Sequence, residues 1–320
     1  FRLPPNSMPN RIAVKTTDPS RVRSISYGDA IAKFVHEIRH WVSYRHSPFI
    51  VAPFYTEVVH GWPYVVMPYC ECTMRQYIDR SVPNTGYPEA LALLVQVICG
   101  LEFARQRGLL AHQDLKPENV LLQNLDSRLA QPHDYPFHWR AKLADFGMAN
   151  GYMELKVPWG SRPYLAPEQY RKDADLSAVD VFACGVMLHE LITGKHPIGE
   201  ATSDIWPIPK PGKSSKWAHE TPWKKWAHSE NKAVFSKFKA GNDLRDLIQS
   251  CLSTNPVERP SLCAFRESLL DALKRCDARS YETLLMLLAY YQSAAIHSEA
   301  INTESDLQRY QFERIDRSKG

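Results

Sequence analysis

The stretch LLAHQDLKPENVLL, residues 109–122, places a dense group of polar side chains between two apolar runs. Eight consecutive positions hold six of these polar residues: His112, Gln113, Asp114, Lys116, Glu118 and Asn119. Polar groups beside a core are costly unless they are paired, and charged groups are costlier still. This pattern therefore indicates a loop whose charges are kept for chemistry.

The composition narrows the class of protein. Of the 320 residues, 44% are hydrophobic and 23% are charged, the balance of a globular chain long enough for two domains or one bilobal domain. The net charge of +4 argues against nucleic-acid binding. No apolar run approaches the roughly 18 residues that a membrane span needs. The seven scattered cysteines form no pair of CxxC units, which favours reduced thiols and a cytoplasmic location.

Periodicity predicts a small β-rich region followed by a larger helical one, with a cleft between them. We expect strands, the first of them buried, at 11–16, 120–123 and 141–147, and a hairpin over 49–70 that turns at HGWP. We expect helices at 28–45, 88–108, 176–194, 242–253, 261–276 and 280–300. Residues 201–228, rich in Pro, Lys and Trp, are predicted to form a loop-like, solvated insertion.

The residues at the edges of these elements suit phosphoryl transfer. Lys15 ends an apolar strand and needs a carboxylate or phosphate nearby, and Glu37 on the following helix can supply the carboxylate. Asn119 and Asp145 are oxygen donors of the kind that Mg²⁺ prefers.

The loop itself adds a base and a cation. Asp114 can orient a hydroxyl group and accept its proton, while Lys116 neutralises charge on the group being transferred. Each residue also has an ordinary structural alternative. Lys15 could end its strand in solvent, Glu37 could be an exposed helix residue, and Asp and Asn are common in turns. Taken together, these alternatives do not explain why the Lys15 strand, the Glu37 helix, the polar loop and Asp145 follow one another in this order.

Six ordered segments resemble the eukaryotic-type protein kinase family: AVK (13–15), the helical Glu37, HQDLKPEN (112–119), DFG (145–147), APE (166–168) and NPVERP (255–260). The resemblance runs from about residue 11 to about residue 275, and DLKPEN is similar to the Ser/Thr-specific branch. It implies an α+β, bilobal fold with four parts: a truncated small lobe (1–66), a hinge (67–72), a large, mainly helical lobe (73–277) and a C-terminal helical extension (278–320).

The resemblance also implies the chemistry of the site. The protein would transfer the γ-phosphate of ATP to Ser or Thr hydroxyls of protein substrates. Lys15 would hold the α- and β-phosphates and pair with Glu37. Asp114 would be the catalytic base, and Lys116 would contact the γ-phosphate. Asn119 and Asp145 would bind Mg²⁺.

Further roles follow from the same resemblance. Adenine would lie between Ala13 and Leu121, against the gatekeeper Met67 and the hinge residues Tyr69 and Cys70. Structural support would come from a packed stack of Trp41, His112 and Phe146, and from Ser161, Asp180 and the ion pair Glu168–Arg259.

Two departures from the family pattern bear on activity and control. No glycine precedes the Lys15 strand, where the family carries its phosphate-binding G-x-G-x-x-G loop. We therefore expect residues 1–320 alone to be poorly active and the parent protein to be active. Gln113 replaces the usual Arg, and the segment MANGYMELKVPW (148–159) contains no Ser or Thr. We expect that activity does not require phosphorylation of this segment.

Two other functions remain open at this level. A pseudokinase would keep the fold without efficient transfer, although Lys15, Asp114 and Asp145 are all present. A small-molecule phosphotransferase would share these residues but generally lacks the APE segment and the Glu168–Arg259 pair. The last helices could pack on the large lobe or on another subunit, so the oligomeric state stays open.

Overall fold

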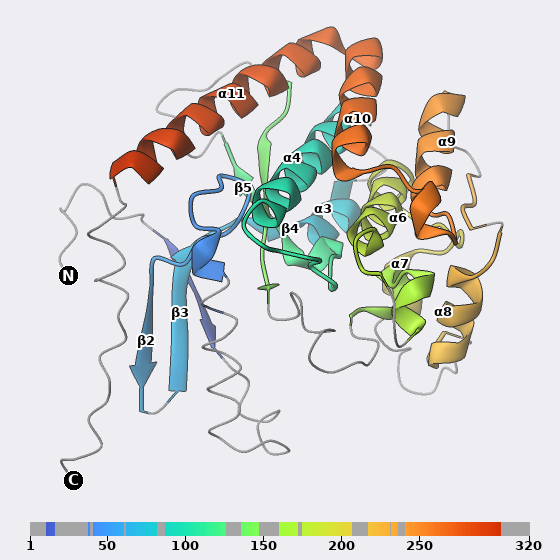
Figure 1. Cartoon of the computed structure of the whole chain (residues 1–320), viewed down its shortest axis with the longest axis horizontal. Coiled ribbons are helices and arrows are strands. Elements are labelled where there is room, and N and C mark those ends of the chain that lie inside the picture. The colour runs from blue at the N-terminus through green and yellow to red at the C-terminus, as the bar shows by residue number, and fades with distance from the viewer. Residues whose placement is uncertain are drawn as a thin grey trace.

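The computed structural model describes residues 11–16, 38, 41–60, 62–81, 87–125, 136–146, 160–171, 175–206, 217–230, 232–235 and 241–301. A small antiparallel sheet and a larger helical region occupy different parts of the molecule (Figure 1). This is the α+β, two-part arrangement that the sequence predicts.

The small sheet has three strands in the order β1-β3-β2, all antiparallel. They are β1 (Ile12–Thr16), β2 (Tyr55–Val59) and β3 (Trp62–Pro68). The predicted hairpin is confirmed as β2 and β3, with His60 in the turn at φ 50°. Since β3 runs through Pro68, the first two residues of the expected hinge belong to a strand.

The first strand is present but not buried as predicted. Ile12 is 49% exposed and Val14 is 54% exposed. Alternate side chains of a strand point to opposite faces. Only the face that carries Ala13 and Lys15 turns toward the core, where Ala13 lies opposite the buried Met67 of β3. The apolar run therefore hides a strand with one covered face.

The described part of the predicted helix 28–45 consists of Ile38 and residues 41–45, of which Ile38 and 41–43 are helical; Glu37 lies outside the described residues. Ile38 and Trp41 are buried, 4% and 1% exposed. The chain then turns into residues 49–51, which lie beside the strand β6 (Trp139–Leu143). Leu143 donates its N–H to the Phe49 carbonyl at 2.8 Å, and Val51 donates to the Leu143 carbonyl at 2.8 Å.

A second sheet holds β4 (Cys72–Thr73), β5 (Val120–Asn124) and β6 in that order. The strand predicted at 120–123 is confirmed. The strand predicted at 141–147 is wrong for residues 144–146, because β6 begins earlier and ends at Leu143; Gly147 lies outside the described residues. Asp145 has φ 63°, a left-handed conformation that cannot continue a ladder, so the chain leaves the sheet just before it.

The predicted helices beyond residue 87 are confirmed to within a few residues. The structure has α3 (Met74–Ser81), α4 (Tyr87–Arg105), α6 (Val179–Thr193), α9 (Asn242–Cys251), α10 (Leu262–Cys276) and α11 (Ala278–Ile301). Helix α6 ends at Gly194, which has φ 71°, and Ser261 caps α10 by accepting the Ala264 N–H at 3.1 Å.

Helix α4 forms the centre of the large region. In the described part of the chain it is the one helix long and apolar enough to cross a membrane by length and composition. Residues 90–98 are all buried, and α4 packs against α10, α6 and β6, as a core helix does. Its buried Gln96 accepts the Ala141 N–H at 3.0 Å, which satisfies a polar group inside this core.

The solvated loop predicted at 201–228 is wrong for the part that the structure describes. It contains α7 (Thr202–Ile205) and α8 (Glu220–Ala227), and Trp223 is fully buried. The Trp226 and Trp223 rings lie 4.6 and 5.6 Å from the ring of the buried His196. Burial lowers the pKa of His196 to about 3, so this histidine is a neutral core residue. Large aromatic side chains bury too much apolar area to remain in solvent.

Candidate active site

Asp114 is the centre of a tight hydrogen-bonded cluster. Its Oδ1 accepts the Ser161 N–H at 2.9 Å and the Ser161 hydroxyl at 3.0 Å. Its Oδ2 accepts Lys116 Nζ at 2.7 Å and Asn119 Nδ2 at 3.1 Å. Lys116 also donates to Ser161 Oγ at 2.6 Å. The carboxylate is therefore fixed from both sides and its side chain keeps 14% exposure, so it has a defined direction toward the surface.

Helix α6 holds the backbone of this loop. Asp180, in its first turn and 1% exposed, accepts the His112 N–H at 3.0 and 3.1 Å and the Gln113 N–H at 3.3 Å. Gln113 has φ 67°, an uncommon conformation for a residue with a Cβ. A buried carboxylate that binds two consecutive N–H groups stabilises this turn. The loop thus rests on the helix core as the sequence predicts for Asp180.

Lys15 on β1 meets Asp145, which lies two residues after the end of β6. Lys15 Nζ lies 2.9 Å from Asp145 Oδ1, and both side chains are partly exposed. Burial by itself raises the pKa of Asp145, but the Lys15 ammonium and its hydrogen bond outweigh this and lower the pKa below its ordinary value. Asp145 is therefore ionised at neutral pH. The predicted partner of Lys15, Glu37, lies outside the described residues.

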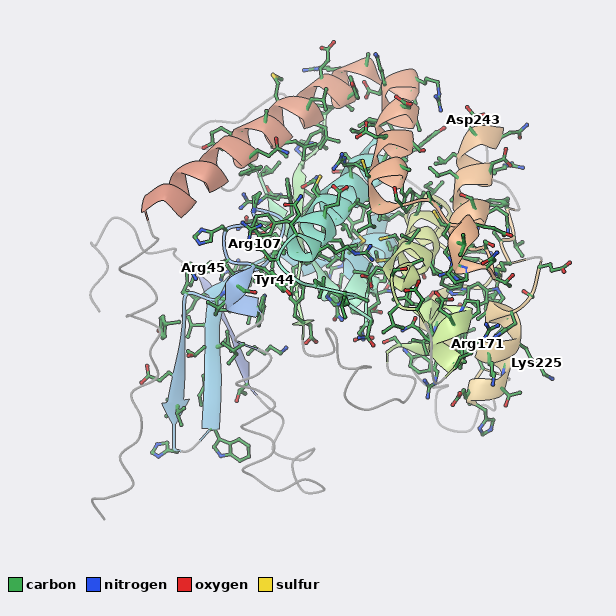
Figure 2. The ribbon with its side chains drawn as sticks, in the orientation of Figure 1. Tyr44, Arg45, Arg107, Arg171, Lys225 and Asp243 are labelled. Carbon is green, nitrogen blue, oxygen red and sulfur yellow. The ribbon has the colours of Figure 1, made fainter. Side chains whose placement is uncertain are left out.

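An aromatic stack fixes the residue after Asp145. Phe146 is 1% exposed, and its ring lies 4.9 Å from the ring of His112 and 5.0 Å from that of Tyr44. Tyr44 lies where the small sheet meets the helical region (Figure 2). The sequence expectation named Trp41 for this stack. In the structure the Trp41 ring is the one near Lys15, with Nζ 5.4 Å from its centroid, and Tyr44 is the residue that sequence reasoning missed.

The residues expected around adenine come from both sheets. Ala13 on β1 and Leu121 on β5 are half-buried, and Met67 on β3 is 5% exposed. Tyr69 and Cys70 follow β3 and are half-buried, with the Arg11 guanidinium 3.9 Å from the centre of the Tyr69 ring. The structure thus places Ala13 and Met67 on the first sheet, Leu121 on the second, and Tyr69 and Cys70 just after β3.

The predicted ion pair Glu168–Arg259 is confirmed. Arg259 Nη2 donates to Glu168 Oε2 at 2.8 Å, and Nη1 donates to a second acceptor, the Ala178 carbonyl, at 3.0 Å. Both residues are buried, 4% and 6% exposed. The pair joins the segment after Ser161 to the start of α6 and to the loop before α10.

A second charged network was not predicted. Arg75 on α3 donates through Nη2 to both oxygens of Glu190 on α6, at 2.9 and 3.0 Å, and through Nε to Glu118 at 3.2 Å. The Tyr164 hydroxyl donates to Glu190 at 2.8 Å, and Thr202 also donates to Glu190. Burial raises the pKa of Tyr164, with the Glu190 charge acting in the same direction. The sequence signal for this network is Glu190, a charged residue in the largely apolar helix α6.

The donor set suits a magnesium ion. Asn119 uses its amide nitrogen on the backbone carbonyl of Asp114 at 2.8 Å and on its carboxylate, which leaves the amide oxygen as its ligand atom. Asp145 contributes an ionised carboxylate. Carboxylate and amide oxygens are hard ligands of the kind that Mg²⁺ takes together with substrate phosphates.

A two-part α+β fold with this loop, this acidic residue after β6 and this buried ion pair is typical of a protein kinase domain. The model of the protein kinase domain matches residues 6–270. The chain therefore belongs to the protein kinase domain family.

Curated relatives agree with this assignment. The chain is 32% identical over 158 residues to serine/threonine-protein kinase grp of Drosophila melanogaster, which covers 47% of this chain and 28% of that protein. It is 33% identical over 239 residues to serine/threonine-protein kinase CHK1 of Mycosarcoma maydis, covering 63% of this chain and 34% of that protein. A bacterial relative, probable serine/threonine-protein kinase PknB of Lactococcus lactis, is 30% identical over 174 residues, covering 52% of this chain and 25% of that protein. The matches thus span between 25% and 34% of the length of these relatives.

Proposed function

We propose that this chain is the catalytic domain of an ATP-dependent serine/threonine protein kinase. The observation that carries the proposal is the cluster in which Lys116, Asn119 and Ser161 all bind the Asp114 carboxylate. Such a cluster fixes a base and a cation side by side, which transfer of a phosphoryl group to a hydroxyl requires. The printed names of the relatives support the Ser/Thr assignment.

The proposed roles follow from this geometry. Asp114 orients the acceptor hydroxyl and takes its proton, and Lys116 neutralises negative charge on the γ-phosphate. Lys15 turns from Asp145 to the α- and β-phosphates when nucleotide enters. Asn119 and Asp145 would hold Mg²⁺, which when bound would neutralise charge across the β- and γ-phosphates.

Adenine would lie between the two sheets, against Ala13 and Leu121, with Met67, Tyr69 and Cys70 along its edge. This assignment keeps residues 1–66 as the small lobe, 67–72 as the hinge, 73–277 as the large lobe and 278–320 as an extension.

A protein substrate is favoured over a small molecule. The Glu168–Arg259 pair is buried and braces the segment that follows Ser161. A rigid platform of this kind suits an extended peptide, whereas a small acceptor would not need it.

All seven cysteines lie in the described part of the chain and are free thiols. This supports our proposal of a reducing, cytoplasmic location.

We also propose that activity does not depend on phosphorylation of residues 148–159. The neutral Gln113 offers no charge for a phosphate. The two residues that follow this segment are held by other contacts. Ser161 bonds to Asp114, and a Cβ added to Gly160 would lie 2.5 Å from the Gln113 carbonyl oxygen. If phosphatase treatment abolished the activity, this part of the proposal would be wrong.

The alternative is a pseudokinase that binds nucleotide or partners without efficient catalysis. The ion pair Lys15–Asp145 favours it, because both groups must exchange partners before they can bind phosphate and metal.

The test is a transfer assay with MgATP labelled at the γ-phosphate and peptides that present Ser, Thr or Tyr. We expect label on Ser and Thr peptides, above the background of the Asp114→Asn variant. If both proteins give the same background while MgATP still raises the melting temperature of the chain, and Asp145→Asn removes that rise, the chain is a pseudokinase.

A further inference from the structure

The C-terminal helix α11 lies beyond the matched domain, which ends at residue 270. It leaves α10, runs back across α4 and ends near the small sheet (Figure 1). Its inner face packs on α4 and α10 through the buried Leu284 and Leu288, so it docks on the large region of its own chain. Family membership therefore does not explain what this helix does.

Just past its middle, α11 touches the turn that follows the Trp41 helix. The Tyr291 ring meets the ring of Phe49 edge to face at 5.8 Å, and the Arg140 guanidinium lies 4.7 Å from the centre of the Tyr291 ring. Phe49 is 4% exposed. Tyr291 thus contacts both the turn and β6, two segments that are distant in sequence.

The turn has little room to move by itself. Its Phe49 carbonyl and Val51 N–H bond to Leu143 at 2.8 Å each, and Lys142 Nζ donates to the Ile50 carbonyl at 3.3 Å. On the α4 side, a Cβ added to Gly100 would lie 2.9 Å from the Phe49 carbonyl oxygen. The turn is therefore packed between β6, α4 and α11, and Tyr291 is the α11 residue that contacts it.

This turn connects directly to the site. Leu143 is the last residue of β6, and Asp145 follows two positions later in its left-handed conformation. At the other end of the turn, Tyr44 packs on Phe146. The backbone of Leu143 before Asp145 and the ring of Phe146 after it are thus both held by residues 44–51, the segment that Tyr291 contacts through Phe49.

We propose that α11 is a built-in clamp, in which Tyr291 and Phe49 are positioning residues that hold Asp145 in place for Mg²⁺. This proposal rests on the proposed function for its catalytic consequence, but the clamp itself is a statement about the fold. An edge-to-face ring pair is strong enough to shift a local equilibrium by about two- to tenfold.

The experiment compares Tyr291→Leu and Tyr291→Phe with the control Met286→Ala. Met286 is on the same helix and 62% exposed. The first readout is amide hydrogen exchange at Val51 and Leu143. We expect about two- to tenfold faster exchange in Tyr291→Leu, little change in Tyr291→Phe, which keeps the ring, and none in the control.

The second readout is the Mg²⁺ concentration for half-maximal activity, measured together with KM for the peptide. The clamp predicts a rise in the Mg²⁺ requirement of about two- to tenfold in Tyr291→Leu with an unchanged peptide KM. Combining Tyr291→Leu with Phe49→Leu should add little to either single change, because both remove the same contact.

Several outcomes would overturn the clamp. They are equal exchange in Tyr291→Leu and Met286→Ala, a loss of kcat with no change in the Mg²⁺ requirement, or fully additive effects of the two Leu variants. If no protein, wild type included, transfers phosphate, the proposed function fails. The exchange data would then still decide whether Tyr291 holds the turn.

Discussion

Two charged clusters include residues of the loop 112–119 and differ in how exposed their side chains are. Around Asp114 and Lys116 the side chains keep 14% and 21% exposure, and at Lys15 and Asp145 they keep 31% and 46%. In the second cluster Glu190 keeps 1% and accepts hydrogen bonds from Arg75, Tyr164 and Thr202. The side chains of the first cluster are exposed enough to bind a ligand. The buried carboxylate of Glu190 in the second cluster is already paired with the protein's own donors.

The difference shows why charge alone does not mark a catalytic group. A buried and fully paired network costs desolvation energy and returns it only in defined geometry. An open cluster contributes little to folding but can exchange its partners for substrate. The open cluster should therefore govern rate, and the closed one should govern stability.

The largest expected effect is on rate. Asp114→Asn keeps an acceptor oxygen for Ser161 but removes the base, so we expect kcat to fall by about 10²–10⁴-fold. The melting temperature should stay close to that of the wild type. A loss of less than tenfold, or a loss explained by unfolding in thermal denaturation, would break the contrast between the two clusters.

The closed cluster should show the opposite response. Glu190→Gln removes the buried carboxylate with which Arg75 Nη2 pairs, and we expect a loss of about 3–5 kcal/mol in the free energy of unfolding, measured with urea. The matched control is Asp79→Asn, since Asp79 lies 3.6 Å from Arg75 but its side chain is 43% exposed. This control should cost less than about 1 kcal/mol. Equal losses would mean that burial does not separate the pairs.

The buried Lys232 extends the comparison to the pH dependence of stability. Lys232 is 1% exposed, donates to the Leu252 carbonyl and lies 5.3 Å from the centre of the Phe182 ring. Burial, with the nearby Arg259 charge, lowers the pKa of Lys232 to about 7, while Glu168 and Glu258 act in the opposite direction. Between pH 7 and the ordinary lysine pKa near 10.5, the unfolded chain binds more protons than the folded one, so this group makes stability rise with pH.

Replacing Lys232 should remove this contribution to the pH dependence of stability. We expect Lys232→Met to stabilise the fold by on the order of 1–3 kcal/mol at pH 6 and by less at pH 9.5, because the buried charge is removed. Urea denaturation at the two pH values measures the difference. A gain that is the same at both would show that Lys232 does not titrate in this window.

Much of the fold could be predicted from local sequence patterns. Two β-rich runs on either side of HGWP predict β2 and β3, helical patterns predict α4, α6 and α10, and the loop 112–119 is recognisable from its residues alone. Local patterns failed where burial depended on distant partners. The apolar run 11–16 predicts a buried strand, although Ile12 faces out. The Trp-rich segment 201–228 predicts a solvated loop, although Trp223 is fully buried. Periodicity reports which face is apolar, not whether another element covers it.

The sequence by itself determined the two-part fold, the loop around Asp114, the pairing of Glu168 with Arg259 and membership of the protein kinase family. Only the tertiary structure decided that Lys15 meets Asp145 across 130 positions and that Arg75 meets Glu190 across 115. It alone placed Tyr291 against Phe49. Such contacts depend on how packed elements cross in space, and a one-dimensional pattern of apolar and charged residues does not specify that crossing.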